Sequence, residues 1–240
     1  TIHSEDRIGF GECAIFRGLS VDDRLDYSEK LDWLCKNINR DFDELWGQLE
    51  AFPSIQFGLE QALMSFKSES PFSLFPSNFT DYKEGIPING LIWMGEASFM
   101  KAQIQNKLKA GFTTLKMKIG AIDFETELAL LKGIRKEFST SEITLRVDAN
   151  GAFQVKDALE KLKTLSDLEI HSIEQPIKQG QYDEMAALCE KSPVDIALDE
   201  ELIGVFSVID KEKVLQTIQP QYIILKPSFV GGFAGSQEWI

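Results

Sequence analysis

Five strand-like segments in the second half of the sequence each end on a charged side chain. The charged residues at these ends are, in chain order, Lys118, Asp148, Glu174, Asp199 and Lys226. If the segments form neighbouring parallel strands, their carboxyl ends meet at one edge of the sheet, and the five side chains share one cavity. Three carboxylates held close together repel one another, and a bound cation relieves that repulsion. The pattern therefore predicts a cation site that is lined by three carboxylates and flanked by lysines.

The donor atoms of this predicted site limit the choice of ion and of reaction. They are oxygen atoms only, with neither histidine nor cysteine in the set, so Mg²⁺ fits best and Mn²⁺ is a substitute. Such an ion can bind the carboxylate of a small-molecule substrate and stabilise an enediolate, which makes the neighbouring carbon acidic. Lys118 can remove that proton if its pKa falls towards neutrality, which the ion and Lys116, on the same face of the strand, both favour. Lys226 would act as a second base or acid, or would stay charged and stabilise the enolate.

Each of these charged residues also has a purely structural explanation. A single acidic residue at a strand end is usually a helix N-cap or a solvated loop charge. Lys116 and Lys118 would suit an exposed edge strand, where lysine is common. Five charged strand ends in the same register favour the functional explanation.

The segments that carry these residues alternate with amphipathic stretches. Strands are expected at residues 88–93, 114–119, 143–147, 170–174, 195–198 and 222–225. Helices are expected between them, at residues 97–109, 124–138, 155–166, 182–191 and 208–216. This order predicts βαβ units and a parallel sheet, and thus the α/β class. Six units in a row favour a TIM-type (β/α) barrel, although the rhythm alone also allows a doubly wound sheet, for which the GxGxxG phosphate loop is missing.

Residues 1–85 differ in character and are expected to form a separate α+β domain. A short strand is expected at 8–15, and helices are expected at 27–38 and 54–66. The proline-containing stretch 68–89 marks a loop at the junction with the barrel domain, residues 86–240. The barrel units and the start without methionine lead us to expect part of a chain of roughly 330–350 residues, with strands of both domains missing.

The composition argues against several kinds of partner. The 240 residues include 25 basic and 38 acidic side chains, and the net charge of −13 disfavours nucleic acid and anionic membranes. The sequence has no run of 18 apolar residues, and its first residues carry no signal-peptide pattern. Cys13, Cys35 and Cys189 show no CxxC spacing, so we expect reduced thiols and a cytoplasmic protein. The pattern leaves the oligomeric state open.

Five short motifs surround the charged residues. They are Lys116-Met-Lys118, Val147-Asp148-Ala-Asn150-Gly151, Ile173-Glu174-Gln175-Pro176, Leu198-Asp199-Glu200 and Leu225-Lys226-Pro227. In this order and spacing, the motifs resemble the muconate-lactonizing-enzyme subgroup of the enolase superfamily. The resemblance implies an N-terminal α+β capping domain on a modified (β/α) barrel.

The resemblance also implies a role for each charged residue. The implied Mg²⁺ ligands are Asp148, Glu174 and Asp199, and the implied acid/base pair is Lys118 and Lys226. The residues implied to support the ligands or to contact the substrate carboxylate are Lys116, Asn150 and Glu200.

The motifs do not separate the reactions that this subgroup catalyses. The stretches 11–20 and 226–233 resemble a branch that removes water from a succinyl-hydroxycyclohexadiene carboxylate and so forms an aromatic ring. Racemisation of N-acylamino acids, epimerisation of dipeptides and cycloisomerisation of muconate use the same two lysines and remain alternatives. A non-catalytic barrel with a structural ion is an alternative of another class, and a lyase with a lysine Schiff base is a fourth.

Overall fold

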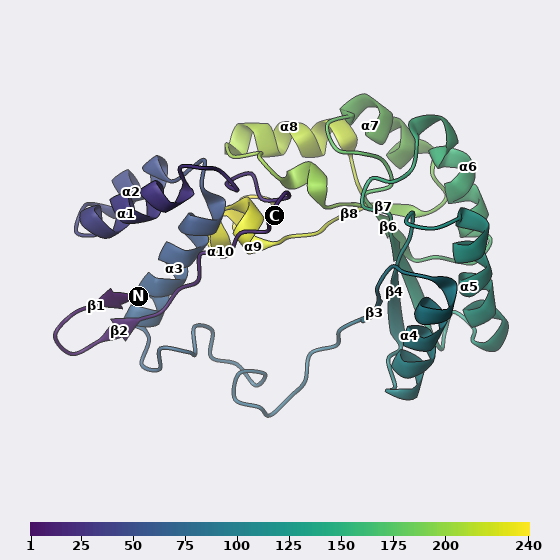
Figure 1. The fold of residues 1–240 in the computed structure, drawn as a ribbon, viewed down its shortest axis with the longest axis horizontal. Coiled ribbons are helices and arrows are strands. Elements are labelled where there is room, and N and C mark those ends of the chain that lie inside the picture. Colours follow the sequence, from purple (N-terminus) through teal and green to yellow (C-terminus); the bar gives the residue numbers. More distant parts are fainter. The chain divides into compact units, whose positions relative to one another are not determined.

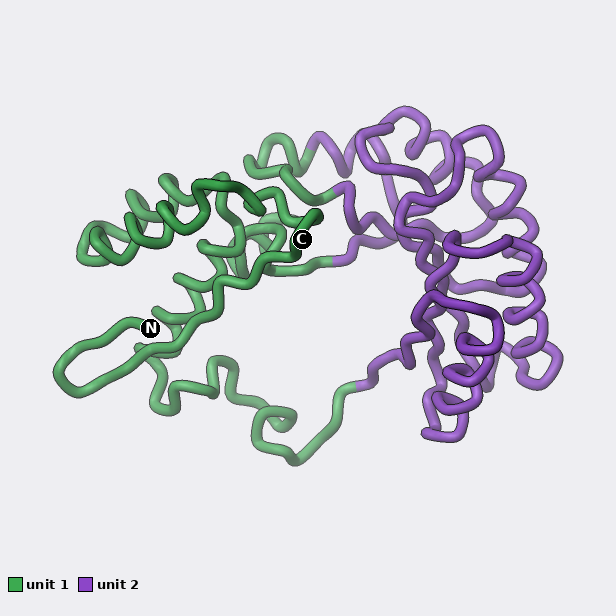
Figure 2. The backbone as a smooth tube through the Cα atoms, in the orientation of Figure 1, with its two compact units in different colours: residues 1–86, 202–212, 225–240 green, residues 87–201, 213–224 purple.

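The computed structural model describes residues 1–240 (Figure 1), which divide into two compact units (Figure 2). Unit 1 consists of Thr1–Ile86, Leu202–Glu212 and Leu225–Ile240, and unit 2 consists of Pro87–Glu201 and Lys213–Ile224. No helix in either unit combines the length and the apolar character needed to cross a membrane. The functional division into a capping domain and a barrel domain stays a prediction.

Unit 2 is built around a parallel sheet of six strands. The strands are β3 (Gly90–Ile92), β4 (Thr114–Lys118), β5 (Thr144–Asp148), β6 (Ser172–Glu174), β7 (Asp195–Leu198) and β8 (Tyr222–Ile223). Each strand pairs with the strand that follows it in the chain. A doubly wound sheet reverses its strand order at a switch point, so the sequential order found here is that of a (β/α) barrel.

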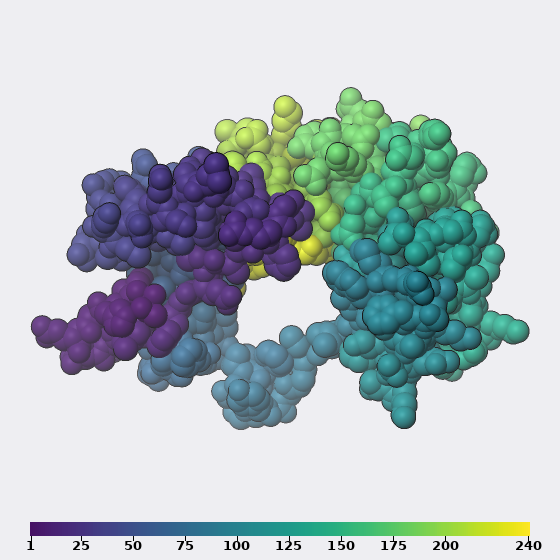
Figure 3. All heavy atoms as spheres, viewed as in Figure 1, coloured from purple at the N-terminus to yellow at the C-terminus, as the bar shows by residue number.

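A helix connects each pair of neighbouring strands, as the sequence predicts (Figure 1). These helices are α4 (Ala97–Lys109), α5 (Phe124–Glu137), α6 (Val155–Ser166), α7 (Tyr182–Lys191) and α8 (Val208–Ile218). Helix α5 begins where the Asp123 carboxylate accepts a hydrogen bond from the Thr126 amide (3.0 Å), and it buries Leu128, Leu131 and Ile134 on one face. In the space-filling view, the side chains of unit 2 form a continuous surface over such helices (Figure 3).

Alternation along the strands separates a buried apolar face from a charged one. The apolar residues of β4 are only 1% exposed, whereas Lys116 and Lys118 alternate with them and point to the opposite face. The parallel register pairs Lys118 with Asp148 and Asp148 with Glu174. The charged face therefore gathers its carboxylates at the carboxyl ends of adjacent strands.

Unit 1 combines a short antiparallel hairpin with helices. Its elements are β1 (Ile2–His3), β2 (Ile8–Gly9), α1 (Tyr27–Asn37), α2 (Phe42–Gln48), α3 (Pro53–Lys67), α9 (Pro227–Val230) and α10 (Gly232–Gln237). Helices α1 and α3 confirm the two predicted helices of this region. Helix α2 was not predicted, although Asp41 gives a local signal: its carboxylate accepts a hydrogen bond from the Asp43 amide at 2.9 Å.

The strand prediction for residues 8–15 is wrong beyond Gly9. The amides of Phe10 and Glu12 donate to side chains of α3, at 2.9 Å in each case, instead of to a neighbouring strand. The backbone also approaches α3 too closely for a side chain, since a Cβ atom at Gly9 would lie 2.2 Å from a carbonyl oxygen of that helix. Contact with a helix therefore replaces the sheet pairing that we expected for this apolar, glycine-containing segment.

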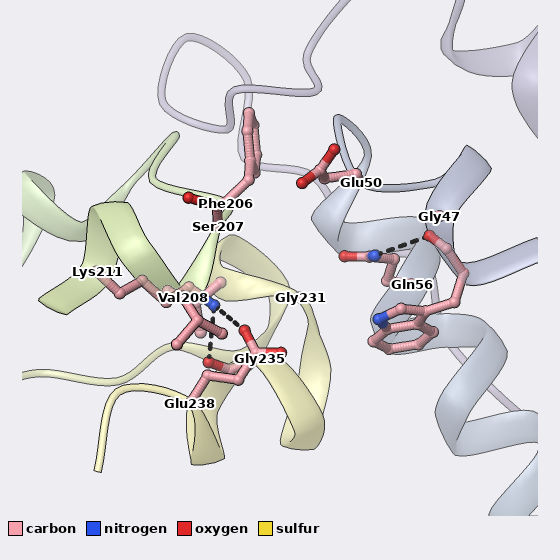
Figure 4. Close-up of a pocket in the computed structure, with 12 residues that line it drawn as sticks. Gly47, Glu50, Gln56, Phe206, Ser207, Val208, Lys211, Gly231, Gly235 and Glu238 are labelled. Carbon is pink, nitrogen blue, oxygen red and sulfur yellow. Dashed lines mark hydrogen bonds and ion pairs between the residues drawn. The ribbon is translucent and has the colours of Figure 1, made fainter. Parts of the chain in front are cut away.

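Unit 1 has its own apolar core and a separate surface cavity. The core consists of Tyr27, Leu34, Leu45, Leu49, Phe52, Ile55 and Leu59. The cavity has a volume of about 250 Å³, and Figure 4 shows the residues that line it. Lys211, which is 2% exposed, donates there to the Gly235 carbonyl oxygen (3.3 Å) and to the Glu238 carboxylate. No residue predicted to do chemistry lines this cavity.

Candidate active site

Unit 2 brings three predicted carboxylates together at the carboxyl ends of its strands. Asp148 and Glu174 are the last residues of β5 and β6, and Asp199 directly follows β7. One oxygen atom from each of the three lies within 4.8 Å of the other two. All three residues are buried, with exposures of 0%, 6% and 2% respectively. The cluster thus forms at the place that the sequence predicts.

Backbone hydrogen bonds hold these carboxylates in register beyond the regular strands. The residue after each of β4, β5 and β6 donates its amide to a carbonyl oxygen of the next strand. These pairs are Ile119–Asp148 (2.9 Å), Ala149–Glu174 (3.0 Å) and Gln175–Ala197 (2.9 Å). Because the ladder continues past Asp148 and Glu174, the Cα positions of these two residues belong to the sheet and not to the loops that follow.

The two lysines of β4 point into this carboxylate cluster. The Lys118 ammonium donates to Asp148 Oδ2 at 2.5 Å and to Asn150 Oδ1 at 2.8 Å. The Lys116 ammonium donates to the Glu174 carboxylate and lies 3.2 Å from Asp148 Oδ2. The side chains of Lys116 and Lys118 are only 16% and 12% exposed, so these ion pairs are shielded from solvent.

The pKa values show that the cluster favours additional positive charge. Burial, together with the charge of Asp148, raises the pKa of Glu174 to about 7, although Lys116 opposes this rise. Burial also acts to raise the pKa of Asp148, but the hydrogen bond from Lys118 and the charge of Lys116 outweigh it, and that pKa lies below its usual value. For Lys116, the effect of burial is outweighed by Glu174 and Asp148, so its pKa is raised and the ammonium form is favoured.

The donor set fits a hard divalent cation such as Mg²⁺. Asp148, Glu174 and Asp199 offer carboxylate oxygen atoms only, and these atoms are close enough to surround one ion. Burial and the neighbouring Asp148 raise the pKa of Glu174 and so disfavour its charged form, and a divalent ion beside the carboxylates would favour that form again.

Asn150 and Glu200 extend the cluster on one side. The Asn150 side chain accepts from Lys118 and donates from Nδ2 to Glu200 Oε1 at 2.8 Å. The Asn150 backbone has a φ of +43°, in the left-handed region that residues other than glycine rarely adopt. The second oxygen of Glu200, Oε2, is buried without a hydrogen-bond partner among the protein atoms. The hydrogen bonds from Lys118 through Asn150 to Glu200 thus orient the lysine and leave one buried carboxylate oxygen of Glu200 without a hydrogen bond.

Lys226 is the predicted site residue that belongs to the other unit. It lies in unit 1, immediately before α9, and its ammonium is 5.8 Å from the centre of the Phe229 ring. The other predicted site residues belong to unit 2. The assignment of Lys226 to the acid/base pair therefore stays a prediction.

Two further residues near the cluster were not predicted. Trp93 follows β3, and the Lys118 ammonium lies 5.8 Å from the centre of its ring, within cation–π range. Arg146 pairs with Lys116 in the register of β4 and β5, and its buried Nε atom has no hydrogen-bond partner. The available signal was positional: Trp93 follows a strand end, and Arg146 shares the parity of Asp148 along β5.

Comparison with known protein families shows which family this barrel belongs to. Residues 100–240 match the family model described as "Enolase C-terminal domain-like". The chain belongs to the enolase superfamily. This confirms the predicted resemblance, and within the superfamily the six parallel strands form part of a TIM-type barrel.

Individual superfamily members are similar over different lengths. The chain is 44% identical to o-succinylbenzoate synthase of Desulfotalea psychrophila, over 97% of the chain and 71% of that protein. It is 30% identical to the L-Ala-D/L-Glu epimerase of Bacillus subtilis, over 65% of the chain and 42% of that protein. The similarity to the synthase thus includes unit 1, whereas the similarity to the epimerase covers a smaller share of the chain.

Solved structures of the superfamily share the fold. The crystal structure of MenC from Desulfotalea psychrophila superimposes with a TM-score of 0.85 at 42% identity, over 99% of the chain and 74% of that structure. The o-succinylbenzoate synthase from Thermosynechococcus elongatus superimposes with a TM-score of 0.76 at 22% identity, over 98% of the chain and 69% of that structure. The second likeness supports the fold alone, and both confirm the predicted α/β class.

Proposed function

We propose that the chain is an o-succinylbenzoate synthase, a hydro-lyase of menaquinone biosynthesis. Its substrate would be 2-succinyl-6-hydroxy-2,4-cyclohexadiene-1-carboxylate, which loses water to give the aromatic product. The observation that carries this proposal is the 44% identity to a protein of that name across 97% of the chain. The buried carboxylate cluster with two lysines supplies the chemistry that such a reaction requires.

We propose that Asp148, Glu174 and Asp199 hold Mg²⁺, with Mn²⁺ as a possible substitute. The three carboxylates fit such an ion, and the synthase structure from Thermosynechococcus elongatus is described as complexed with Mg in the active site. When bound, the ion supplies positive charge beside the substrate carboxylate and so stabilises the negative charge that develops there.

In the proposed reaction, Lys118 as the neutral amine accepts the proton from the carbon next to the substrate carboxylate. The electron pair of that C–H bond is first held as an enediolate on the substrate carboxylate, and it then forms the new ring double bond as the C–O bond to the hydroxyl group breaks. The protonated Lys118 then gives its proton to the departing hydroxyl on the same face, so water leaves and the amine is regenerated. Asn150 supports this role because its side chain binds the Lys118 Nζ atom at 2.8 Å and fixes its direction.

The remaining lysines are proposed to act by charge. The carboxylates of Glu174 and Asp148 outweigh the opposing effect of burial and keep Lys116 in its ammonium form, so it balances the cluster and does not compete as a base. Lys226 is proposed to stay protonated and to stabilise the enolate. The proposed partner is a small-molecule carboxylate substrate. A cytoplasmic location is proposed because all three cysteines are free thiols.

Epimerisation of a dipeptide is the second candidate. It is favoured by the 36% identity to the L-Ala-D/L-Glu epimerase of Francisella tularensis over 56% of the chain. In that reaction, Lys118 and Lys226 would work from opposite faces of the substrate carbon, and no bond other than C–H would break.

The test is an assay of the chain on the cyclohexadiene acid beside L-Ala-L-Glu and a panel of N-acylamino acids, in D₂O, with Mg²⁺ or with EDTA. We expect Mg²⁺-dependent release of the aromatic product, which is measured by its ultraviolet absorbance. Deuterium incorporation into a dipeptide without dehydration of the cyclohexadiene acid would replace this proposal by the second candidate. Calorimetry without Mg²⁺ binding would favour a barrel that does no metal-dependent chemistry.

A further inference from the structure

Gln175, next to Glu174, has a fully buried side chain whose hydrogen bonds are all made within the protein. Its Oε1 atom accepts from the amides of Asp199 and Glu201, at 3.2 Å each. Its Nε2 atom donates to the carbonyl oxygen of Ile177 (3.1 Å) and to the Glu201 carboxylate (2.9 Å). A side-chain amide has two acceptor positions and two donor hydrogens, so this network uses its complete capacity and fixes its orientation.

The backbone amide and carbonyl groups of Gln175 are also hydrogen-bonded within the protein. Its amide donates to the carbonyl oxygen of Ala197 (2.9 Å), and its carbonyl oxygen accepts from the amide of Gly151 (2.7 Å). Its φ of +37° lies in the left-handed region, which a residue with a side chain adopts only where its surroundings enforce it. Gln175 therefore links the carboxyl ends of β5, β6 and β7 through one residue.

Glu201 completes this arrangement from the other end. It is 3% exposed, and its second carboxylate oxygen accepts from the Gly180 amide at 2.6 Å. The loop after β6 is thereby attached to the turn after β7, with Gln175 between them. Neither Gln175 nor Glu201 is one of the three clustered carboxylates, and both contact the segments that carry them.

We propose that Gln175 is a positioning residue that sets the spacing between the Glu174 and Asp199 carboxylates, and that Glu201 locks Gln175 in place. Gln175 is joined to Glu174 by a peptide bond, and its side-chain oxygen accepts a hydrogen bond from the Asp199 amide. The distance between two neighbouring strand ends at the cluster thus depends on one side chain. This inference rests on the proposed metal site, because its consequence is the affinity for Mg²⁺.

The chemistry of the amide suggests a matched pair of variants. In Gln175→Met, a neutral side chain of similar length removes the acceptor for the Asp199 amide. In the double variant Gln175→Glu with Glu201→Gln, the two groups exchange places, so the total charge is unchanged, the acceptor for Asp199 is kept, and a donor again faces a carboxylate; the bond to the Ile177 carbonyl oxygen is the one that is lost. The control is Gln56→Met in unit 1, which makes the same change at another buried glutamine, 6% exposed.

The experiment is calorimetric titration of Mg²⁺ into each folded variant, with unfolding temperatures measured in EDTA. We expect Gln175→Met to bind Mg²⁺ about 10–100-fold more weakly, and the exchange variant to stay within about threefold of the wild type. We expect Gln56→Met to lower the unfolding temperature without changing the dissociation constant. If Gln175→Met does not fold, Gln175→Asn, whose amide ends one methylene short of Asp199, makes the same comparison.

Two results separate the failure of this inference from the failure of the proposed function. A wild-type chain that does not bind Mg²⁺ overturns the proposed metal site, and the inference with it. In the second case the wild type binds Mg²⁺, and Gln175→Met is less stable but binds Mg²⁺ equally well. That result leaves the proposed function intact and assigns Gln175 to stability alone.

Discussion

Replacing Lys116 by methionine tests whether the carboxylate cluster depends on its ammonium groups. The substitution keeps most of the length of the side chain and removes the charge that contacts Glu174 and Asp148. These partners have side-chain exposures of 7% and 0%, so solvent cannot replace the lost ion pair. We therefore expect the variant to be less stable than the wild type when Mg²⁺ is absent.

The size of the loss follows from burial and from the contact that remains. Removing one partner of a buried ion pair costs about 3–5 kcal/mol in the free energy of unfolding. Lys118 still donates to Asp148 at 2.5 Å in the variant, so we expect a loss of about 3 kcal/mol, at the lower end of that range. For a chain of this size, the loss corresponds to a decrease of about 6–12 °C in Tm.

The assay is thermal unfolding followed by circular dichroism, in EDTA and in excess Mg²⁺. A bound ligand stabilises the folded state by about 2.7 kcal/mol when its free concentration is about a hundred times its Kd. We expect Mg²⁺ to stabilise Lys116→Met more than the wild type, because the ion no longer competes with the Lys116 ammonium. The control is Lys163→Met, which removes an exposed pair with Glu160 and should cost about 0.5 kcal/mol or less. A Tm in EDTA within about 2 °C of the wild type would refute the view that Lys116 neutralises buried carboxylates.

Three further predictions concern single residues. Lys118→Ala should lower kcat by at least about 100-fold, with an unchanged circular dichroism spectrum; normal turnover would remove Lys118 from the role of base. Gly9→Ala should lower the free energy of unfolding by about 3 kcal/mol in urea titration, because its Cβ would lie 2.2 Å from the Ala62 carbonyl oxygen, and a neutral effect would contradict that packing. Burial raises the pKa of Cys13 to about 11, so iodoacetamide at pH 8 should modify the exposed Cys35 first, and alkylation of Cys13 should accelerate as the pH rises. Mass spectrometry gives the order of modification, and equal rates at pH 8 would contradict the burial of Cys13.

The carboxylate cluster was predictable because it depends on two regular patterns. Parallel strands align their carboxyl ends, and side chains alternate along each strand, so the positions of Lys118, Asp148 and Glu174 fix their shared face. Both patterns act through the backbone and are visible as spacing. For the same reason, the helices between the strands were found at nearly their observed bounds.

Contacts between distant side chains were not predictable in this way. Gln175 binds Glu201 through a buried hydrogen bond that connects residues 26 positions apart, and nothing in either local sequence requires it. The segment after Gly9 was expected to be a strand because it is apolar and contains glycines, but side chains of α3 accept hydrogen bonds from the amides of Phe10 and Glu12. In both cases a polar group has several possible partners, and only the packed structure selects one.

The backbone ladder that extends one residue past β4, β5 and β6 has a consequence for how this protein can change. Asp148 and Glu174 occupy the last positions that the sheet holds rigidly, and the connecting loops begin directly after them. Substitutions or insertions further along these loops alter the surface offered to a substrate without moving the carboxylate oxygen atoms of Asp148 and Glu174. The acid/base chemistry and the choice of substrate are thus separately adjustable, so a new specificity can arise by mutation while proton abstraction continues to work.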